Sequence, residues 1–319
     1  MTFPQLRASD VESALSVIAP RLAPTRLLEW PLPGGRSLRL KLECEQPTGS
    51  FKVRGAVSNL ARLPESPEGF VAASAGNHGL GVAWAARACE RRERVTLFVP
   101  ESAPARKIEK LRAFDIDLRV GGALFDDAER FAHEFERQTG ARFIHAYDDV
   151  LTAAGQGTVA PEVDRALGPV GTFVVPVGGG GLLTGIAAWV KERRPETRIV
   201  AVQPEASPAL RESIKRGVPL LEFEAGPTLA DGLAGGIGRL VFEHRRLIDE
   251  TVVVPEALIH RAIRDLHRAG VRAEASGAIT LAAAILEEAR TWPSPIVGVV
   301  TGSNIDDAAL DRVLRETEG

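Results

Sequence analysis

The sequence predicts an α/β fold built on parallel sheets, and three observations support this prediction. Short runs rich in valine, isoleucine and phenylalanine alternate with segments whose apolar residues recur at helical spacing. Two of these runs, residues 173–177 and 296–300, contain no polar side chain, which is typical of strands that helices cover on both faces. Glycines cluster where several runs end, and folds of this class bind ligands at the carboxyl ends of strands.

Nine strands are predicted, with helices between them. Their residues are 38–42, 70–73, 95–99, 118–120, 143–145, 173–177, 199–202, 251–254 and 296–300. Ser9 and Glu12 form a capping-box pattern that predicts the start of the first helix, and Pro104 and Pro255 suit the first turns of later helices. Residues 80–89, 257–269 and 277–289 are further predicted helices, most clearly in the last two, where apolar residues have helical spacing.

The composition excludes several classes of partner. The 39 basic and 42 acidic residues give a net charge of −3 without a charged block, which argues against nucleic acid and anionic membranes. Two cysteines are too few for a disulfide framework, and no apolar run approaches the ~20 residues of a membrane span. The first residues lack the pattern of a signal peptide. We therefore expect a cytoplasmic enzyme or binding protein for a small molecule.

Lys52 is the first candidate for chemistry. It follows a stretch of glycine and small polar residues and precedes a helical pattern, so it is expected at a helix N-terminus. The positive potential there opposes protonation of its amine, and a neutral lysine amine can form a Schiff base with a carbonyl compound. The alternative is an ordinary surface lysine in a turn.

Residues 74–79, Ser-Ala-Gly-Asn-His-Gly, are the second candidate segment. They lie between a predicted strand and a predicted helix, where free backbone N–H groups can hold a carboxylate or a phosphate. The alternative is an ordinary turn in which Asn77 caps the helix. His78 alone suits a hydrogen-bonded loop residue better than a catalytic base.

The third candidate segment is a run of four glycines, Gly178 to Gly181, again between a strand and a helix. Backbone without side chains can wrap an anion with its N–H groups. The dinucleotide fingerprint fails in every frame, and no nucleotide-binding P-loop sequence is present, so a single phosphate monoester is favoured. A tight turn without a ligand is the alternative. A fourth segment, Thr301 to Asn304, follows the last strand, where Asn304 is a candidate helix N-cap.

Six segments, in this order, resemble the serine/threonine dehydratase and serine racemase family of pyridoxal 5'-phosphate enzymes, which have the fold called type II. The segments are residues 41–56, 74–79, Gly155-Gln156-Gly157-Thr158, 178–181, Thr228-Leu229-Ala230-Asp231-Gly232 and Thr301-Gly302-Ser303-Asn304. The resemblance runs from about Arg26 to Asp306. It implies two open-sheet lobes, as in the tryptophan synthase β subunit, with the cofactor between them.

The resemblance also implies roles for individual residues. Lys52 matches the lysine that holds the cofactor and later moves the Cα proton, and Phe51 packs beside the cofactor ring. Asn77 matches the residue that binds the ring 3'-oxygen, and Thr301 offers its hydroxyl to the pyridine nitrogen. The residues expected to bind the cofactor phosphate are Gly178, Gly179, Gly180 and Gly181. The residues expected to receive the substrate carboxylate are Ser74, Ala75, Gly76, Asn77 and His78.

The expected reaction is β-elimination from a β-hydroxy amino acid, with L-threonine or L-serine first, to a 2-oxo acid and ammonia. A hydroxyl at the pyridine nitrogen carries no charge, so the cofactor should be a moderate electron sink, which suits elimination. Alternatives are a serine racemase, a dehydratase of 3-hydroxyaspartate or a phenylserine, and a non-catalytic binder of the cofactor or an amino acid. Cysteine synthase-type β-replacement is disfavoured, because those enzymes have Thr at the position of His78.

Several positions depart from the family pattern. Ala75 replaces a serine that serves racemases, which favours dehydration. Gln203 and Ala209 stand where metal-dependent members carry acidic ligands, so no metal is expected, with Glu205 as a candidate substitute. Tyr147 stands where many members have Phe or Asn against the cofactor.

The family pattern also predicts the domain organisation. Residues 55–145 are expected to form the smaller α/β lobe, and residues 1–54 with 146–319 the larger cofactor-binding lobe. No C-terminal regulatory domain is expected, and the family resemblance implies a homodimer.

Overall fold

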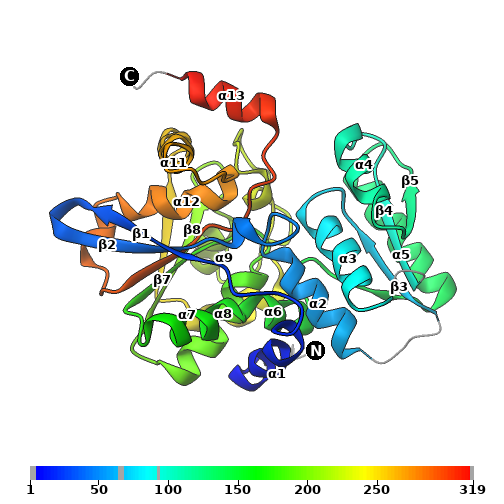
Figure 1. Cartoon of the computed structure of the whole chain (residues 1–319), viewed down its shortest axis with the longest axis horizontal. Helices are drawn as coiled ribbons and strands as arrows, with labels where there is room; N and C mark the ends of the chain where they lie inside the picture. Colours follow the sequence, from blue (N-terminus) through cyan, green and yellow to red (C-terminus); the bar gives the residue numbers. More distant parts are fainter. Residues whose placement is uncertain (1–4, 64–67, 92–93, 317–319) are drawn as a thin grey trace.

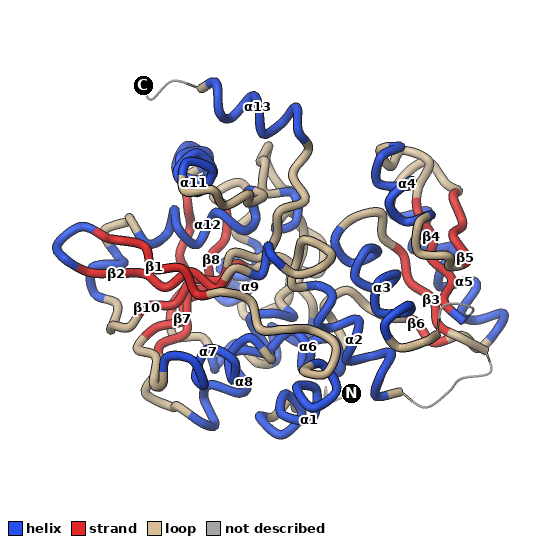
Figure 2. The backbone as a smooth tube through the Cα atoms, in the orientation of Figure 1, coloured by secondary structure: helices blue, strands red, loops and turns tan. Residues whose placement is uncertain are grey.

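The structure, a computed structural model, describes residues 5–63, 68–91 and 94–316. Ten strands in this part of the chain form two separate sheets, one of six strands and one of four. Figures 1 and 2 show the two groups of strands on opposite sides of the molecule, with helices α2 (Lys52–Arg62) and α6 (Val150–Gly157) between them. The predicted α/β fold is confirmed.

The larger sheet has the strand order β1-β2-β10-β7-β8-β9. Its strands are β1 (Leu27–Leu32), β2 (Arg36–Lys41), β7 (Thr172–Pro176), β8 (Arg198–Pro204), β9 (Glu250–Val254) and β10 (Ile296–Val299). β1 and β2 are antiparallel, and the other neighbours are parallel. Because β7 and β10 are parallel neighbours, their carboxyl ends lie side by side at the same end of the sheet.

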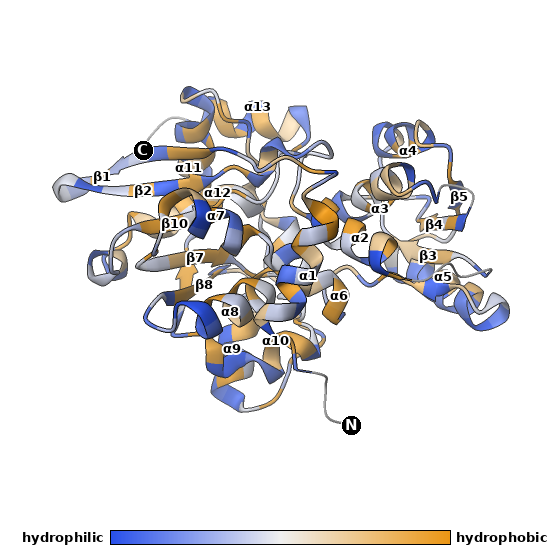
Figure 3. Ribbon diagram, turned by 60° about the horizontal axis from the view of Figure 1, so that its bottom comes forward, coloured by the Kyte–Doolittle hydropathy of each residue, from blue (hydrophilic) through white to orange (hydrophobic). Residues whose placement is uncertain are grey.

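Both faces of this sheet are buried. Along β7, Val174 packs into a core with α11 (Glu256–Arg268) and α12 (Ala275–Ala284). Its neighbours Phe173 and Val175 pack on the opposite face. That face is covered by α1 (Ala8–Ile18), α7 (Val159–Leu167), α8 (Gly181–Arg193), α9 (Ala209–Arg216) and α10 (Arg239–Glu243). Because successive side chains point to opposite faces, a two-sided core explains the apolar runs in the sequence. Figure 3 shows the apolar colour along β7 and β8.

The smaller sheet is wholly parallel, in the order β5-β4-β3-β6. Its strands are β3 (Phe70–Ala73), β4 (Val95–Val99), β5 (Asp117–Val120) and β6 (Arg142–Phe143). Helix α3 (Asn77–Ala88) shares a core with α2 and one face of this sheet, and α5 (Phe125–Thr139) covers the other. The remaining helices are α4 (Ala105–Arg112) and α13 (Asp307–Arg315).

All nine predicted strands are present, with shifts of one or two residues at most of their ends. Strand β1, which pairs with β2 at the outer edge of the larger sheet, is not among the predicted strands. The capping-box prediction was wrong. The first helix begins at Ala8, and the Asp10 carboxylate accepts a hydrogen bond from the Arg7 N–H at 2.9 Å. The helix expected over 277–289 instead runs over Ala275–Ala284.

Glycines allow helices α2, α6 and α8 to pack closely. A Cβ on Gly155 of α6 would lie 2.9 Å from the Cα of Gly55 in α2. On the other side of α6, a Cβ on Gly157 would lie 2.5 Å from the carbonyl carbon of Gly185 in α8. Such distances exclude larger residues at these contacts. The stack places the first turn of α2, which carries Lys52, near the first turn of α8, which follows the glycine run.

Candidate active site

A cavity of about 940 Å³ is lined by residues that follow strands of both sheets. Ser74 follows β3, Gly178 follows β7, and Thr301 follows β10. The structure brings all the predicted site residues together in the wall of this cavity. They are Phe51, Lys52, Ser74, Ala75, Gly76, Asn77, His78, Gly178, Gly179, Gly180, Gly181 and Thr301.

Lys52 is the first residue of α2, as the sequence predicted. Its Nζ donates a hydrogen bond to the carbonyl oxygen of Ala146 at 3.0 Å and lies 5.2 Å from the centre of the Phe51 ring. Burial lowers the pKa of Lys52 from 10.5 to about 8, while the negative charge of Glu274 acts in the opposite direction. A substantial fraction of this amine is therefore neutral near pH 8 and available as a base or a nucleophile.

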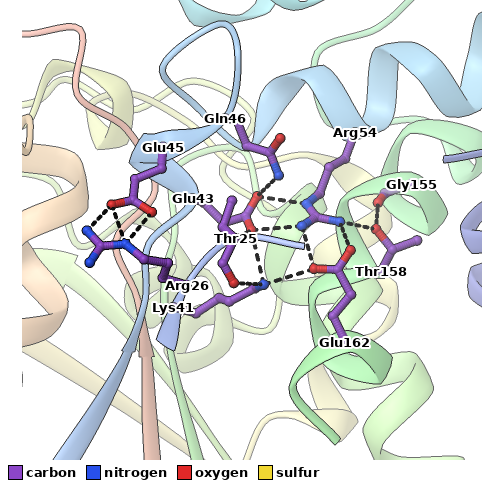
Figure 4. Close-up of polar contacts among 10 residues, drawn as sticks. All are labelled: Thr25, Arg26, Lys41, Glu43, Glu45, Gln46, Arg54, Gly155, Thr158 and Glu162. Carbon is purple, nitrogen blue, oxygen red and sulfur yellow. Dashed lines mark hydrogen bonds and ion pairs between the residues drawn. The ribbon is translucent and has the colours of Figure 1, made fainter. Parts of the chain in front are cut away.

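A buried ion cluster, consisting of Lys41, Glu43, Arg54 and Glu162, fixes the helix turn that carries Lys52 (Figure 4). Arg54 lies on that turn, and its five N–H donors are all used. Two go to Glu43 at 2.7 and 2.8 Å, two to Glu162 at 2.7 Å, and one to Thr158 at 3.0 Å. The carboxylates hold the pKa of Arg54 well above its ordinary value. Strand β2, helix α2 and helix α7 are thereby joined behind the lysine.

The second predicted segment lies at the start of α3. Asn77 is the first helical residue and Gly76 the N-cap, so the alternative in which Asn77 caps the helix is wrong. Ser74 Oγ accepts a hydrogen bond from the Gly76 N–H at 3.1 Å, which shapes the turn. His78 is buried and donates from Nε2 to the carbonyl oxygen of Ile144 at 2.9 Å. Burial lowers the pKa of His78 to about 3, so it is neutral and structural.

The four glycines meet four different neighbours. Cβ atoms on Gly178, Gly179, Gly180 and Gly181 would lie 2.4, 2.2, 2.4 and 2.6 Å from Gly232, Tyr147, Val241 and Gln156 in turn. Gly180 also has a φ of +95°, which L side chains rarely adopt. As the N-cap of α8 it has no side chain to accept the first N–H groups of that helix. These free N–H groups lie at the N-terminus of α8, where the helix meets the cavity, and they can bind an anion.

The segment after β10 is tied to the loop before Lys52. The Phe51 N–H donates to the carbonyl oxygen of Thr301 at 3.1 Å, and the Ser303 N–H donates to that of Gly49 at 2.8 Å. The Thr301 hydroxyl donates to the carbonyl oxygen of Ser276 at 3.1 Å, which leaves its lone pairs available. Asn304 is not a helix N-cap as the sequence suggested, because α13 begins at Asp307 with Asp306 as its N-cap.

The structure adds residues that sequence reasoning did not assign to the site. Glu274, Ser276, Gln156 and Asp231 line the cavity. Glu274 is buried, and burial together with Asp231 raises its pKa to about 7. The one sequence signal for Glu274 is its place as a lone acidic residue before an apolar helix. The partners that give it a role come from distant parts of the chain.

The structure shows where two residues that depart from the family pattern, Ala75 and Gln203, lie. Ala75 lines the cavity, so a methyl group stands at the position for which the family resemblance implies a hydroxyl in racemases. Gln203 is buried and its Oε1 accepts hydrogen bonds from the N–H groups of Leu210 and Arg211, so this side chain caps α9. The expectation that the protein binds no metal stays a prediction.

Comparisons with known proteins place this chain in one family. Residues 18–302 match the family described as "Pyridoxal-phosphate dependent enzyme". The chain is 40% identical over 287 residues to the L-threonine ammonia-lyase of Thermotoga maritima, covering 88% of this chain and 71% of that protein. It is 34% identical over 318 residues to the L-threonine dehydratase catabolic TdcB of Staphylococcus aureus, covering 96% and 91%. The solved structure of maize serine racemase superposes with a TM-score of 0.88 at 30% identity, covering 97% of each chain.

The chain therefore belongs to the pyridoxal-phosphate dependent enzymes, and within them it has the type II fold. Polar groups of the cavity fit this cofactor. Lys52 supplies an amine of lowered pKa, and the first turn of α8 supplies N–H donors for a phosphate. Ser276 Oγ and Gln156 Oε1 are buried cavity-lining atoms that have no partner within the described protein, as expected of a pocket that receives a polar ligand.

No helix in the described ranges combines the length and the apolar character needed to cross a membrane.

Proposed function

We propose that this protein is an ammonia-lyase that acts on a β-hydroxy amino acid, with L-threonine and L-serine as the first candidates. The observation that carries the proposal is the position of Lys52. Its amine has a pKa of about 8 and lies in a cavity wall beside two helix N-termini that can bind anions. The names of the Thermotoga maritima and Staphylococcus aureus relatives support L-threonine as the first substrate to test.

The residues of the chain divide the work as follows. The glycine run and the first turn of α8 hold the cofactor phosphate, and Asn77 and Thr301 bind the two polar positions of its ring. The turn from Ser74 to His78 receives the substrate carboxylate with backbone N–H groups. When bound, the cofactor withdraws electrons from the substrate Cα and so acidifies its proton. Lys52 removes that proton as a base.

Loss of the β-hydroxyl as water completes the elimination. The released enamine tautomerises and takes up water, so the net products from L-threonine are 2-oxobutanoate and ammonia, and those from L-serine are pyruvate and ammonia. The reaction needs no external oxidant or reductant. Ala75 favours this outcome over racemisation, because a methyl group cannot return a proton to the face opposite Lys52.

The test uses purified protein loaded with pyridoxal phosphate. We expect a visible absorption band, and after addition of L-threonine or L-serine we expect 2-oxo acid and ammonia in equal amounts. A visible band without product would reject these two substrates and direct the search to 3-hydroxyaspartate and phenylserine. A band with no turnover of any β-hydroxy amino acid would favour a non-catalytic binder.

The likeness to maize serine racemase makes racemisation the second candidate function. Chiral chromatography of serine after incubation separates the two. Accumulation of D-serine faster than pyruvate would identify a racemase and contradict the role given to Ala75.

The proposal also covers the lobe boundaries, the oligomeric state and the cellular location of the protein. We place the smaller lobe at residues 55–145, which contains the four strands of the smaller sheet. The family resemblance supports a cytoplasmic homodimer. Light scattering of the purified protein at the mass of one chain, 34.1 kDa, would contradict the dimer.

A further inference from the structure

Glu274 is a buried carboxylate in the cavity wall for which the proposed reaction gives no role. It is 9% exposed and is the residue immediately before α12. Its side chain does not cap its own helix. Instead Oε1 accepts a hydrogen bond from Asn77 Nδ2 at 2.8 Å, and Oε2 accepts one from the backbone N–H of Asn304 at 3.1 Å.

The position of this carboxylate is fixed from several sides. The Glu274 N–H donates to the carbonyl oxygen of Gly302 at 2.9 Å. A Cβ on Gly302 would lie 2.4 Å from Glu274 Oε1, so residue 302 must be glycine for the side chain to lie where it does. These contacts fix the carboxylate between the segment that follows β10 and the first turn of α3.

The contacts determine which way the Asn77 amide points. Asn304 Nδ2 donates to Asn77 Oδ1 at 2.7 Å and also to the carbonyl oxygen of Thr48 at 2.8 Å. The Asn77 oxygen is thus occupied by a donor, and one of its two amide N–H groups is occupied by Glu274. The second N–H is left to donate to a ligand in the cavity. The opposite orientation would bring an amide N–H against the Asn304 amide and an oxygen against a carboxylate.

We propose that Glu274 is a positioning residue that holds the Asn77 amide with its free N–H toward the ring 3'-oxygen of the cofactor. This inference rests on the cofactor-binding role given to Asn77 under the proposed function. It does not depend on which amino acid is the substrate. Asn304 assists from the other end of the same amide.

The charges around Glu274 are consistent with this role. Burial and, to a smaller extent, the charge of Asp231 raise its pKa, whereas Asn77, the Asn304 N–H and Lys107 lower it. Its own charge raises the pKa of Lys52 on α2 and that of the Cys44 thiol. An ionised Glu274 accepts hydrogen bonds at both oxygens, as the two donors require. A glutamine here has one oxygen and one NH₂ group, so one of the two donors would face another donor.

The experiment compares Glu274→Gln with a matched control, Asp249→Asn. Asp249 also accepts a backbone N–H, that of Ile199 at 2.7 Å, and pairs with Lys191, but it does not line the cavity. Pyridoxal phosphate is titrated into each cofactor-free protein, and the pH dependence of the visible absorption is recorded. We expect Glu274→Gln to weaken cofactor binding about tenfold and to move the spectral midpoint to lower pH, because a negative charge near Lys52 is removed. Asp249→Asn should change neither.

A double-mutant cycle with Asn77→Ala separates positioning from general support of the fold. If Glu274 acts through Asn77, Glu274→Gln causes little further loss of cofactor affinity in the Asn77→Ala background, whereas the shift of the spectral midpoint, which reflects the lost charge near Lys52, persists there. Equal losses of affinity in the two backgrounds, or wild-type affinity in Glu274→Gln alone, would overturn the inference. Should Glu274→Gln not fold, Glu274→Asp and Glu274→Asp/Asn77→Ala provide the same cycle, because the shorter carboxylate keeps the charge but draws back from the Asn77 amide. Cofactor binding without lyase activity in the wild type would refute the proposed function and leave this test intact.

Discussion

The two sides of Lys52 are built differently. Behind it, in the buried ion cluster, the charges of Lys41, Glu43, Arg54 and Glu162 are paired with one another, and Arg54 has no unused donor. In front of it, the cavity wall holds an amine of lowered pKa, a carboxylate of raised pKa, and two buried hydroxyl or amide oxygens that have no partner among the described residues. The cluster is complete without a ligand, whereas the cavity is not.

This difference shows how the chain can hold a reactive amine. A lysine partly removed from water needs a rigid helix turn, and the ion cluster provides that rigidity through full pairing. The groups that face the cavity remain poorly satisfied until a cofactor with a phosphate and a polar ring enters. Rigidity and reactivity therefore lie on opposite sides of the same turn.

The largest effect is expected for Lys52→Ala, which tests the cavity in front of the helix turn. Removing the amine to which the proposed function assigns transfer of the Cα proton should lower kcat/KM on the order of 10³-fold or more. The fold should persist, because the lysine makes one hydrogen bond, to Ala146. Steady-state kinetics and circular dichroism check the two statements. Retained turnover would remove the basis of the proposed function.

Arg54→Met tests the buried ion cluster behind Lys52. It leaves Glu43 and Glu162 buried without their main cation, and breaking a buried ion pair in this way costs about 3–5 kcal/mol of unfolding free energy. Urea denaturation of the cofactor-free protein measures the loss. Arg193→Met, which breaks an exposed ion pair with Glu12, is the control and should change stability little. Similar losses in both variants would mean that the cluster has no special weight.

A smaller effect is expected for Gly180→Ala. The residue has a φ of +95°, and the added methyl would lie 2.4 Å from the Val241 side chain, so the N-terminus of α8 must shift. The left-handed conformation alone costs an alanine about 1–2 kcal/mol. We expect weaker binding of pyridoxal phosphate, measured by titration. Gly217→Ala, with a φ of +72° and open space around it, is the matched control for backbone strain.

The smallest change, in pH alone, tests the lowered pKa of Lys52. Capture of the cofactor aldehyde needs the neutral amine. With a pKa of about 8 the capture rate should rise with pH and reach half its maximum near pH 8. At its ordinary pKa of 10.5 the amine would still be more than about 99% protonated at that pH. Stopped-flow absorbance after mixing cofactor-free protein with pyridoxal phosphate gives the profile. A midpoint above pH 10 would contradict the account of the cavity.

The sequence predicted the strands well because burial on both faces leaves a local mark, an unbroken apolar run. It did not predict β1, which carries Glu29 and Pro31 and lies at a sheet edge where one side needs no ladder partner. The first helix start was misplaced by two residues, because Arg7 rather than Ser9 is the N-cap and Asp10 rather than Glu12 accepts its N–H.

The candidate site was predictable where its residues form contiguous motifs and not elsewhere. Lys52 and the four glycines stand in short segments whose composition points to their use. Glu274 does not, because its partners Asn77 and Asn304 lie 197 and 30 residues away. Asn304 was interpreted as a helix cap, since a cap is the ordinary local role of an asparagine before a helix. Contacts of this kind exist only once the two sheets are in place.

The most direct test of the central claim is a product balance on the cofactor-loaded protein with L-threonine and with L-threonine deuterated at Cα. We predict one ammonia for each 2-oxobutanoate, slower release from the deuterated substrate, and no release by Lys52→Ala. Two results would contradict the claim that Lys52 moves the proton that starts an elimination. One is that the protein consumes no β-hydroxy amino acid, L-threonine included. The other is that Lys52→Ala turns over L-threonine as fast as the wild type.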